Sequence, residues 1–139
     1  MDKSLLDTDI LSEIIKGRDQ TVLAKAAAYR AAFGLYTITT LTVLEIVKGF
    51  HKVGREDRIQ QFLSGLPSAE LLTLDAHSAE IGGRIYADLE RTGQPIGRVD
   101  PIIAAIAILH NLTLVTGNVA HYQRIQALGY ALRLDNWRV

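Results

Sequence analysis

The stretch that decides the fold lies near the N-terminus, where residues 4–15 read SLLDTDILSEII. The run Ser4-Leu5-Leu6 has the length and composition of a short buried strand. Asp7 ends this run, and Thr8 or Asp9 then caps a helix with a leucine and isoleucines on its inner face. A buried strand that passes directly into an amphipathic helix is typical of a parallel sheet covered by helices.

The same alternation continues along the chain. Further strands are expected at residues 35–39, 70–74, 113–116 and 131–134, the last at an edge of the sheet. Further helices are expected at residues 21–33, 42–53, 56–66, 75–91, 101–109 and 119–128. We therefore expect one α/β domain over residues 1–139, with a central, mainly parallel sheet of four to five strands.

Composition limits the classes of function. The chain has 139 residues, 48% of them hydrophobic, and its 15 Lys and Arg balance 15 Asp and Glu. It has no cysteine, which excludes disulfides, thiolate zinc sites and cysteine nucleophiles. Zero net charge argues against a bulk polyanion binder but leaves room for a basic rim around an acidic centre. The N-terminus does not resemble a signal peptide and no apolar stretch is long enough to span a membrane, so we expect a cytoplasmic protein without membrane contact.

Polar side chains gather where the expected strands end. Asp7 follows the first strand, and Thr116 and Asn118 follow the fourth. Glu45 is expected in the first turn after the second strand, and Asp100 at the start of a buried helix. Function in open α/β sheets sits beyond the C-terminal ends of the strands, where these residues would converge.

Three carboxylates in one place repel each other unless a cation neutralises them. Oxygen ligands without cysteine or a histidine cluster favour a hard ion such as Mg²⁺ or Mn²⁺. Such an ion activates water and stabilises the charge of a phosphodiester displacement. The pattern therefore indicates metal-dependent phosphoryl chemistry.

Structural alternatives remain open for each of these residues. Asp7 and Asp100 both stand where a helix N-cap is expected, and Glu45 follows Thr42 at capping-box spacing. Asn118 also suits a turn. Thr8, Asp9 and Thr116 are candidate supporting residues, and Glu13 is a further candidate for the acidic rim. Basic residues flank two of the acids, and a phosphate-binding role competes with simple solvation for Lys48, Lys52 and Arg98.

Five segments, taken in order, resemble the PIN-domain ribonucleases, and most of all the VapC toxins of toxin–antitoxin pairs. They are LLDTDILSEII, ITTLTVLEIVKGF, IGRVDPIIAAIAI, LTLVTGNVAHY and LRLDNW. The resemblance implies a three-layer α/β/α sandwich and a Mg²⁺- or Mn²⁺-dependent endoribonuclease that cleaves tRNA or rRNA and inhibits translation. It also implies a cognate VapB-type antitoxin and a homodimer. The candidate contact surfaces are the helix containing Gly82-Gly83 and the helices after Asp9 and Glu45.

The resemblance also implies roles for the individual residues. The acidic quartet of the family matches Asp7, Glu45, Asp100 and the position of Asn118, with Asp7 and Asp100 as direct metal ligands and Glu45 as a third ligand. Thr116 matches a hydroxyl residue near the metal. This chain departs from the family pattern at Asp9, which is often Asn, and at Asn118, which coordinates without adding charge.

Two other functions compete with this one. Asp7-Thr8-Asp9 after an apolar strand also fits a haloacid-dehalogenase-like phosphohydrolase, although Leu11 stands where that family has Thr or Val. A catalytically silent PIN-like binding module is the second alternative.

Overall fold

A five-stranded parallel sheet forms the centre of the chain in a computed structural model that describes residues 1–139. Its strands are β1 (Ser4–Leu6), β2 (Tyr36–Thr39), β3 (Ala69–Leu72), β4 (Thr113–Val115) and β5 (Arg133–Asp135). The strand order is β3-β2-β1-β4-β5, and every neighbouring pair is parallel. From β1 the chain first adds β2 and β3 on one side and then β4 and β5 on the other. The C-terminal end of β1 is therefore the topological switch point, which is where ligands bind in such sheets.

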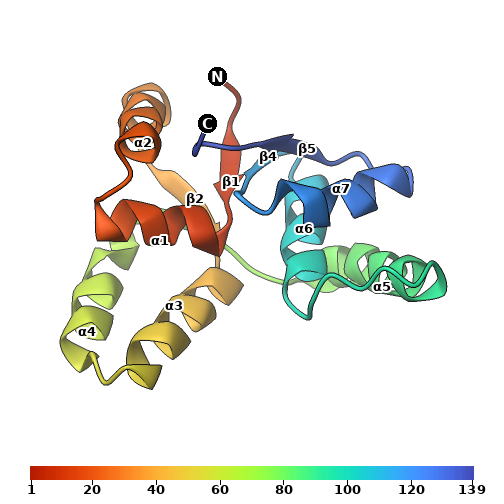
Figure 1. Ribbon diagram of the computed structural model, residues 1–139, viewed down its shortest axis with the longest axis horizontal. Coiled ribbons are helices and arrows are strands. Elements are labelled where there is room, and N and C mark those ends of the chain that lie inside the picture. Colours follow the sequence, from red (N-terminus) through yellow and green to blue (C-terminus); the bar gives the residue numbers. More distant parts are fainter.

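Seven α-helices cover the two faces of this sheet (Figure 1). They are α1 (Thr8–Lys16), α2 (Gln20–Phe33), α3 (Thr40–Lys52), α4 (Glu56–Gly65), α5 (Ala76–Arg91), α6 (Asp100–Leu109) and α7 (Val119–Ala127). Figure 1 shows α1 to α4 on one side of the strands and α5 to α7 on the other. The three-layer α/β/α sandwich is therefore confirmed.

The central strand shows why two helical layers are needed. Leu5 and Leu6 are fully buried, yet they belong to different hydrophobic clusters. Leu5 packs with α5, α6 and α7, whereas Leu6 packs with α1, α2 and α3. Successive side chains on a strand point to opposite faces, so a strand with two consecutive buried leucines requires a cover on both faces.

Most of the expected elements are present, with shifted ends. The third strand lies at residues 69–72 and the last at 133–135, where 70–74 and 131–134 were expected. The last strand does lie at an edge of the sheet, as predicted. The short 3₁₀ turn Leu66–Ser68, which contains Pro67, follows α4.

Two of the capping alternatives are wrong. Helix α3 begins at Thr40, and Thr39 is its N-cap, whose hydroxyl accepts a hydrogen bond from the amide of Thr42 at 3.2 Å. Glu45 is thus beyond the first turn and forms no capping box. Asp100 lies inside α6, whose N-cap position is Val99, and its side chain makes no capping bond. Both carboxylates are left free for another role.

The paired glycines of α5 have a partial explanation within the chain. A β-carbon on Gly82 would lie 3.6 Å from the β-carbon of Ala105 in α6, so Gly82 lies in the contact between these two helices. Gly83 has nothing within 4 Å. None of the helices combines the length and the apolar character needed to cross a membrane.

Candidate active site

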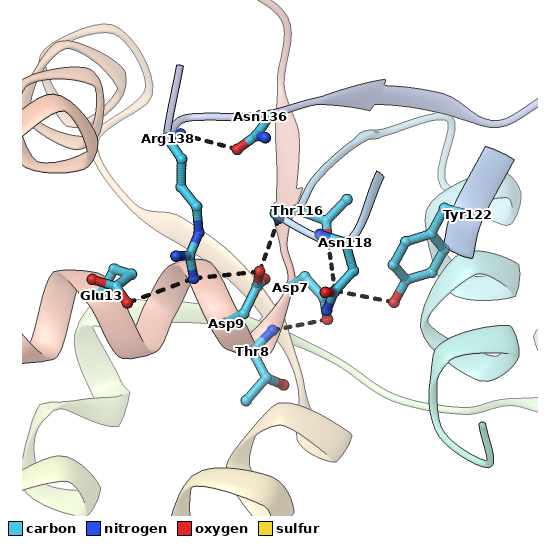
Figure 2. A network of polar contacts seen from close by, with 10 residues as sticks. Asp7, Thr8, Asp9, Glu13, Thr116, Asn118, Tyr122, Asn136 and Arg138 are labelled. Carbon is cyan, nitrogen blue, oxygen red and sulfur yellow. Dashed lines mark hydrogen bonds and ion pairs between the residues drawn. The ribbon is translucent and has the colours of Figure 1, made fainter. Parts of the chain in front are cut away.

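Asp7 stands at the C-terminal end of β1 and is almost completely buried. Its oxygen Oδ1 accepts the amide proton of Thr8 at 2.9 Å, which makes it the N-cap of α1. Its oxygen Oδ2 accepts from the hydroxyl of Thr116 at 2.9 Å and from the hydroxyl of Tyr122 at 3.1 Å (Figure 2). Asp7 therefore caps α1, so the expectation that Thr8 or Asp9 caps this helix is wrong. Capping uses only one of the two oxygens of Asp7.

No cation pairs with Asp7, and this determines its electrostatics. Burial, together with the negative charges of Asp9 and Asp100, raises the pKa of Asp7 to about 7, against the lowering effect of the hydrogen bond from Thr116. Burial also raises the pKa of the Tyr122 hydroxyl, so this group stays a donor. Neutral donors thus hold a carboxylate whose negative charge is left uncompensated.

Asp100 lies in the first turn of α6, close enough to Tyr122 for the tyrosine hydroxyl to affect its pKa. Burial raises its pKa, and the charge of Glu45 raises it again, while Tyr122 and His121 lower it. The imidazole Nδ1 of His121 lies 3.8 Å from Asp100 Oδ2. The charge of Asp100 raises the pKa of Asp7, and the charge of Glu45 raises the pKa of Asp100, so the structure brings these three carboxylates near one another.

A hydroxyl pair positions Glu45. The hydroxyl of Thr8 donates to Glu45 Oε1 at 2.6 Å and lies 2.9 Å from the hydroxyl of the fully buried Thr42. Because Thr8 gives its only proton to Glu45, Thr42 must be the donor to Thr8. This chain of bonds links α1 to α3 and fixes the glutamate beside the end of β1.

Asp9 lies on α1, on the opposite side of the β1 end from Tyr122 (Figure 2). Its Oδ2 accepts from the amide of Gly117 at 2.9 Å and lies 3.7 Å from Nη2 of Arg138. The same guanidinium nitrogen lies 3.5 Å from Glu13 Oε1. Burial raises the pKa of Asp9, opposed by the Gly117 amide and by the positive charge of Arg138.

Asn118 is exposed and holds the N-cap position of α7 without a side-chain capping bond. Its backbone amide donates to the hydroxyl of Thr116 at 3.0 Å, so Thr116 links the loop after β4 to Asp7. Thr116 thus supports Asp7 directly. The side chain of Asn118 makes no hydrogen bond that would fix it toward the carboxylates.

The basic candidates lie outside this network. Lys48, Lys52 and Arg98 are exposed and make no ion pair. Lys48 and Lys52 follow Glu45 by three and seven residues, which places all three on one face of α3. Arg98 belongs to the loop that leads into Asp100. Burial and the charge of Asp100 raise the pKa of Tyr86, and the charge of Arg98 lowers it.

The donor set suits a hydrated divalent ion. Asp7 and Asp100 offer carboxylate oxygens with raised pKa values, which is the state that a cation would relieve. No three acidic or histidine side chains are arranged to enclose an ion in the present side-chain positions. Mg²⁺ usually retains several waters and needs only one or two protein carboxylates, so the residues fit it without a closed cage.

Sequence reasoning missed several residues of this site, namely Tyr122, Thr42, His121, Gly117 and Arg138. Only Tyr122 could have been found from the sequence. It lies in a short helix directly after the fourth strand, and a tyrosine there can place its hydroxyl beside the C-terminal end of the strand. Arg138 and Gly117 gave no such signal, since their contact depends on the path of the chain after β5. The histidines were expected at the surface or partly packed, and all are exposed.

Comparisons with known proteins agree with this geometry. The PIN domain profile matches residues 4–126. The tRNA(fMet)-specific endonuclease VapC of Shigella flexneri is 30% identical over 97% of this chain and 98% of the relative. Ribonuclease VapC2 of Haemophilus influenzae (strain ATCC 51907 / DSM 11121 / KW20 / Rd) is 33% identical over the same shares.

Solved structures give the same result. The DNA-bound VapBC complex of Salmonella typhimurium contains a chain that is 28% identical, with a TM-score of 0.82 and 99% of both chains covered. VapBC2 of Rickettsia felis, bound to a DNA fragment from its promoter, gives 27% identity and a TM-score of 0.81, with 96% of this chain and 98% of the other covered. The chain belongs to the PIN-domain family and, within it, to the VapC ribonucleases.

Proposed function

We propose that this chain is a divalent-metal-dependent endoribonuclease that acts as the toxin of a toxin–antitoxin pair and inhibits translation by cleaving RNA. The observation that carries the proposal is the buried Asp7 carboxylate at the switch point of the sheet, with Asp100 and Glu45 beside it and no cation paired with it. The ribonuclease names of relatives that align along nearly the whole chain support it.

We assign the roles within the site as follows. Asp7 and Asp100 would hold Mg²⁺ or Mn²⁺, which supplies positive charge to the phosphate and lowers the pKa of water. Glu45 Oε1 is occupied by Thr8, so Oε2 is the oxygen left to receive the proton of the attacking water or to complete the ion's ligands. Thr116 and Tyr122 hold Asp7 in place. Asn118 would contribute through its amide oxygen.

The RNA would approach along the exposed basic residues. Lys48 and Lys52 continue the face of α3 that carries Glu45, and Arg98 precedes Asp100. Lysine and arginine contacts to phosphate position a nucleic acid without reading its sequence. Either a tRNA or an rRNA substrate is therefore compatible with these residues. Selection of one RNA over the other would depend on side chains that contact the bases.

A VapB-type antitoxin is the proposed protein partner. A groove of about 330 Å³ lies between α1, α2, α3, α4 and β2. Apolar side chains line it, among them Leu11 and Phe50, and Arg30 and Arg58 stand at its polar positions. An antitoxin segment with apolar anchors and acidic neighbours would fit these walls. The related chains solved within VapBC complexes support this assignment.

A direct test is cleavage of total RNA by the purified protein with Mn²⁺, compared with the variants Asp7→Asn and Asp100→Asn. We expect the wild type to cleave at defined sites and both variants to lose cleavage while keeping the circular dichroism of the wild type. Arg84→Gln, which removes only an exposed ion pair on α5, is the matched control.

The outcomes separate the competing functions. Metal-dependent RNA cleavage that persists in both aspartate variants would contradict the proposed mechanism. A folded wild type that cleaves no RNA but binds its antitoxin would be the silent binding module. The phosphohydrolase alternative has no support from the PIN-domain match, and turnover of small phosphate esters without RNA cleavage is the result that would revive it.

A further inference from the structure

A pocket lies between α5 and the segment that connects α5 to α6. Its volume is about 250 Å³. Its walls are formed by Tyr86, Leu89 and Glu90 of α5, by residues 95–98 of the connecting segment, and by Pro101 of α6. Pro101 follows Asp100 directly and Arg98 precedes it by two residues, so this Tyr86 pocket adjoins the proposed metal site.

The α5 wall of the Tyr86 pocket combines an aromatic ring with a free carboxylate. Tyr86 and Glu90 are four residues apart in α5, which places them on the same face of the helix. Tyr86 is half-buried, and Leu89 and Pro101 form the buried, apolar part of the lining. Glu90 is exposed and forms no ion pair, although Arg98 lines the same pocket. The carboxylate of Glu90 is therefore available to a ligand.

The other wall offers peptide groups that the fold leaves unpaired. In Figure 1 the connecting segment runs back alongside α5. The amides and carbonyls of Ile96, Gly97 and Arg98 make no hydrogen bond to the rest of the backbone. The φ angle of Gly97 is 109°, a conformation that favours glycine. The segment thus presents three consecutive N–H donors at the pocket without forming a helix or a strand.

Arg98 connects the Tyr86 pocket to the acidic end of the sheet. Burial is the main cause of the raised pKa of the Tyr86 hydroxyl, and the charges of Asp100 and Arg98 also act on it, so both groups lie near it. An exposed guanidinium beside the metal site is suited to hold a phosphate. An RNA whose phosphate lies at Asp100 would therefore have a neighbouring base within reach of the pocket.

The chemistry of the two walls selects one kind of base. Bases splayed out of single-stranded RNA stack on aromatic side chains and are read by hydrogen bonds along their edges. An ionised carboxylate only accepts hydrogen bonds, and it has two oxygens to do so. Guanine is the RNA base with two adjacent donors, N1–H and the 2-amino group, on its Watson–Crick edge. Its O6 and N7 acceptors suit free backbone amides.

We propose that the Tyr86 pocket binds an unstacked guanine of the RNA next to the phosphate that is cleaved, and so helps to choose the cleavage site. Tyr86 supplies the stacking surface, Glu90 accepts from the two guanine donors, and the amides of residues 96–98 face its acceptors. The inference rests on the ribonuclease function proposed above and names a feature of its substrate.

The first test needs no RNA and no metal. The full chain is titrated with GMP, AMP, CMP and UMP, and the ring protons of its five tyrosines are followed by NMR. GMP should move the ring signals of Tyr86 upfield by stacking, while those of Tyr36 and Tyr130 stay in place. The other three nucleotides should bind about 5- to 150-fold more weakly, the discrimination that one bidentate contact to a base supplies. Ribose 5-phosphate, which lacks a base, should not shift Tyr86.

Variants separate stacking from edge recognition. Glu90→Gln removes the paired acceptors and should abolish the preference for GMP while the upfield shift of Tyr86 remains. Tyr86→Leu keeps an apolar side chain but has no aromatic face. In the inactive Asp7→Asn protein it should weaken binding of a fluorescent uridine decamer with one central guanosine by about fivefold or more. Tyr86→Phe keeps the ring and Arg84→Gln changes only an exposed ion pair, so both should bind this RNA as before.

The contrary results are equally specific. A Tyr86 shift that ribose 5-phosphate produces as strongly as GMP, or equal affinity of the wild type for all four nucleotides, would overturn the inference. Unchanged RNA binding by Tyr86→Leu would overturn it as well, and these results would leave the proposed ribonuclease untouched. A wild type that binds GMP at Tyr86 but cleaves no RNA would overturn the proposed function, and with it the placement of this base beside a cleaved phosphate.

Discussion

Asp7 and Asp9 are two residues apart in the sequence, yet the protein treats their charges in opposite ways. Asp7 ends β1 and receives hydrogen bonds only from neutral groups, including Thr116 and Tyr122. Asp9 lies on α1, accepts a hydrogen bond from the Gly117 amide and forms an ion pair with the guanidinium of Arg138. A carboxylate left without a counterion is suited to bind a cation, whereas a paired one is suited to hold structure.

The largest expected effect comes from exchanging these two residues for their amides. Asp7→Asn should lower the rate of RNA cleavage by about 10²- to 10³-fold, the loss typical when a group that stabilises transition-state charge is removed. Asp9→Asn should cost less than about tenfold, the lower end for a supporting residue. Single-turnover cleavage rates at saturating Mn²⁺ measure both. Equal losses for the two variants would remove the distinction between Asp7 and Asp9.

The pH dependence of stability should separate the same two residues. The pKa of Asp7 is about 7 in the folded chain and near 3.8 when unfolded, so the folded state binds more protons between these values. Stability of the metal-free protein should therefore fall as pH rises from about 4 to about 7, by about 2–4 kcal/mol from Asp7.

Urea unfolding in EDTA at pH 4.5 and 7.5 measures this fall. Asp7→Asn removes the uncompensated charge, so it should be more stable than the wild type at pH 7.5 and similar to it at pH 4.5. The raised pKa values of Asp9 and Asp100 leave a smaller slope of the same sign in the variant. A wild type that gains stability as pH rises through this window would contradict the assignment of Asp7.

Tyr122→Phe tests how much the hydrogen bond from the Tyr122 hydroxyl contributes to the position and the pKa of Asp7. Loss of the hydroxyl removes one of three hydrogen bonds to the carboxylate and should raise its pKa further. We expect cleavage to fall by about tenfold, as for other groups that orient a ligand. The midpoint of the stability change in EDTA should move to higher pH. An unchanged midpoint would show that Thr116 and Thr8 suffice.

The smallest effect should come from the face of α3 beyond Glu45. Lys48→Gln and Lys52→Gln should each lower RNA affinity uniformly across sequences and reduce the salt dependence of binding by about 0.7 in the logarithmic slope. Binding of a fluorescent RNA to the inactive Asp7→Asn protein at several salt concentrations measures it. Slopes equal to that of the Arg84→Gln control would show that this face does not meet the RNA.

The sequence was sufficient to predict where the strands lie, within a few residues, and which acidic residues come after them. Short apolar runs locate strands, and parallel strands place their C-terminal ends together, so the shared site of Asp7, Glu45 and Asp100 follows from local patterns. The start of α3 could not be predicted from local patterns. Thr39, Thr40 and Thr42 are all acceptable N-caps, and the strand expected at residues 35–39 runs directly into them. Only packing selects Thr39.

The partners that distinguish Asp7 from Asp9 were beyond local patterns. Tyr122 reaches Asp7 across 115 residues, and Gly117 reaches Asp9 across 108. Nothing in the neighbourhood of Arg138 in the sequence indicates that Trp137 is anchored on α2. Such contacts depend on tertiary packing, which periodicity does not encode.

The central position of β1 has a consequence for synthesis on the ribosome. β1 emerges early, but its neighbour β4 and the groups that hold Asp7 follow more than a hundred residues later. A nascent chain therefore carries its acidic residues long before it can arrange them into a site. The acidic edge of the sheet can therefore be assembled only when most of the chain has been synthesised.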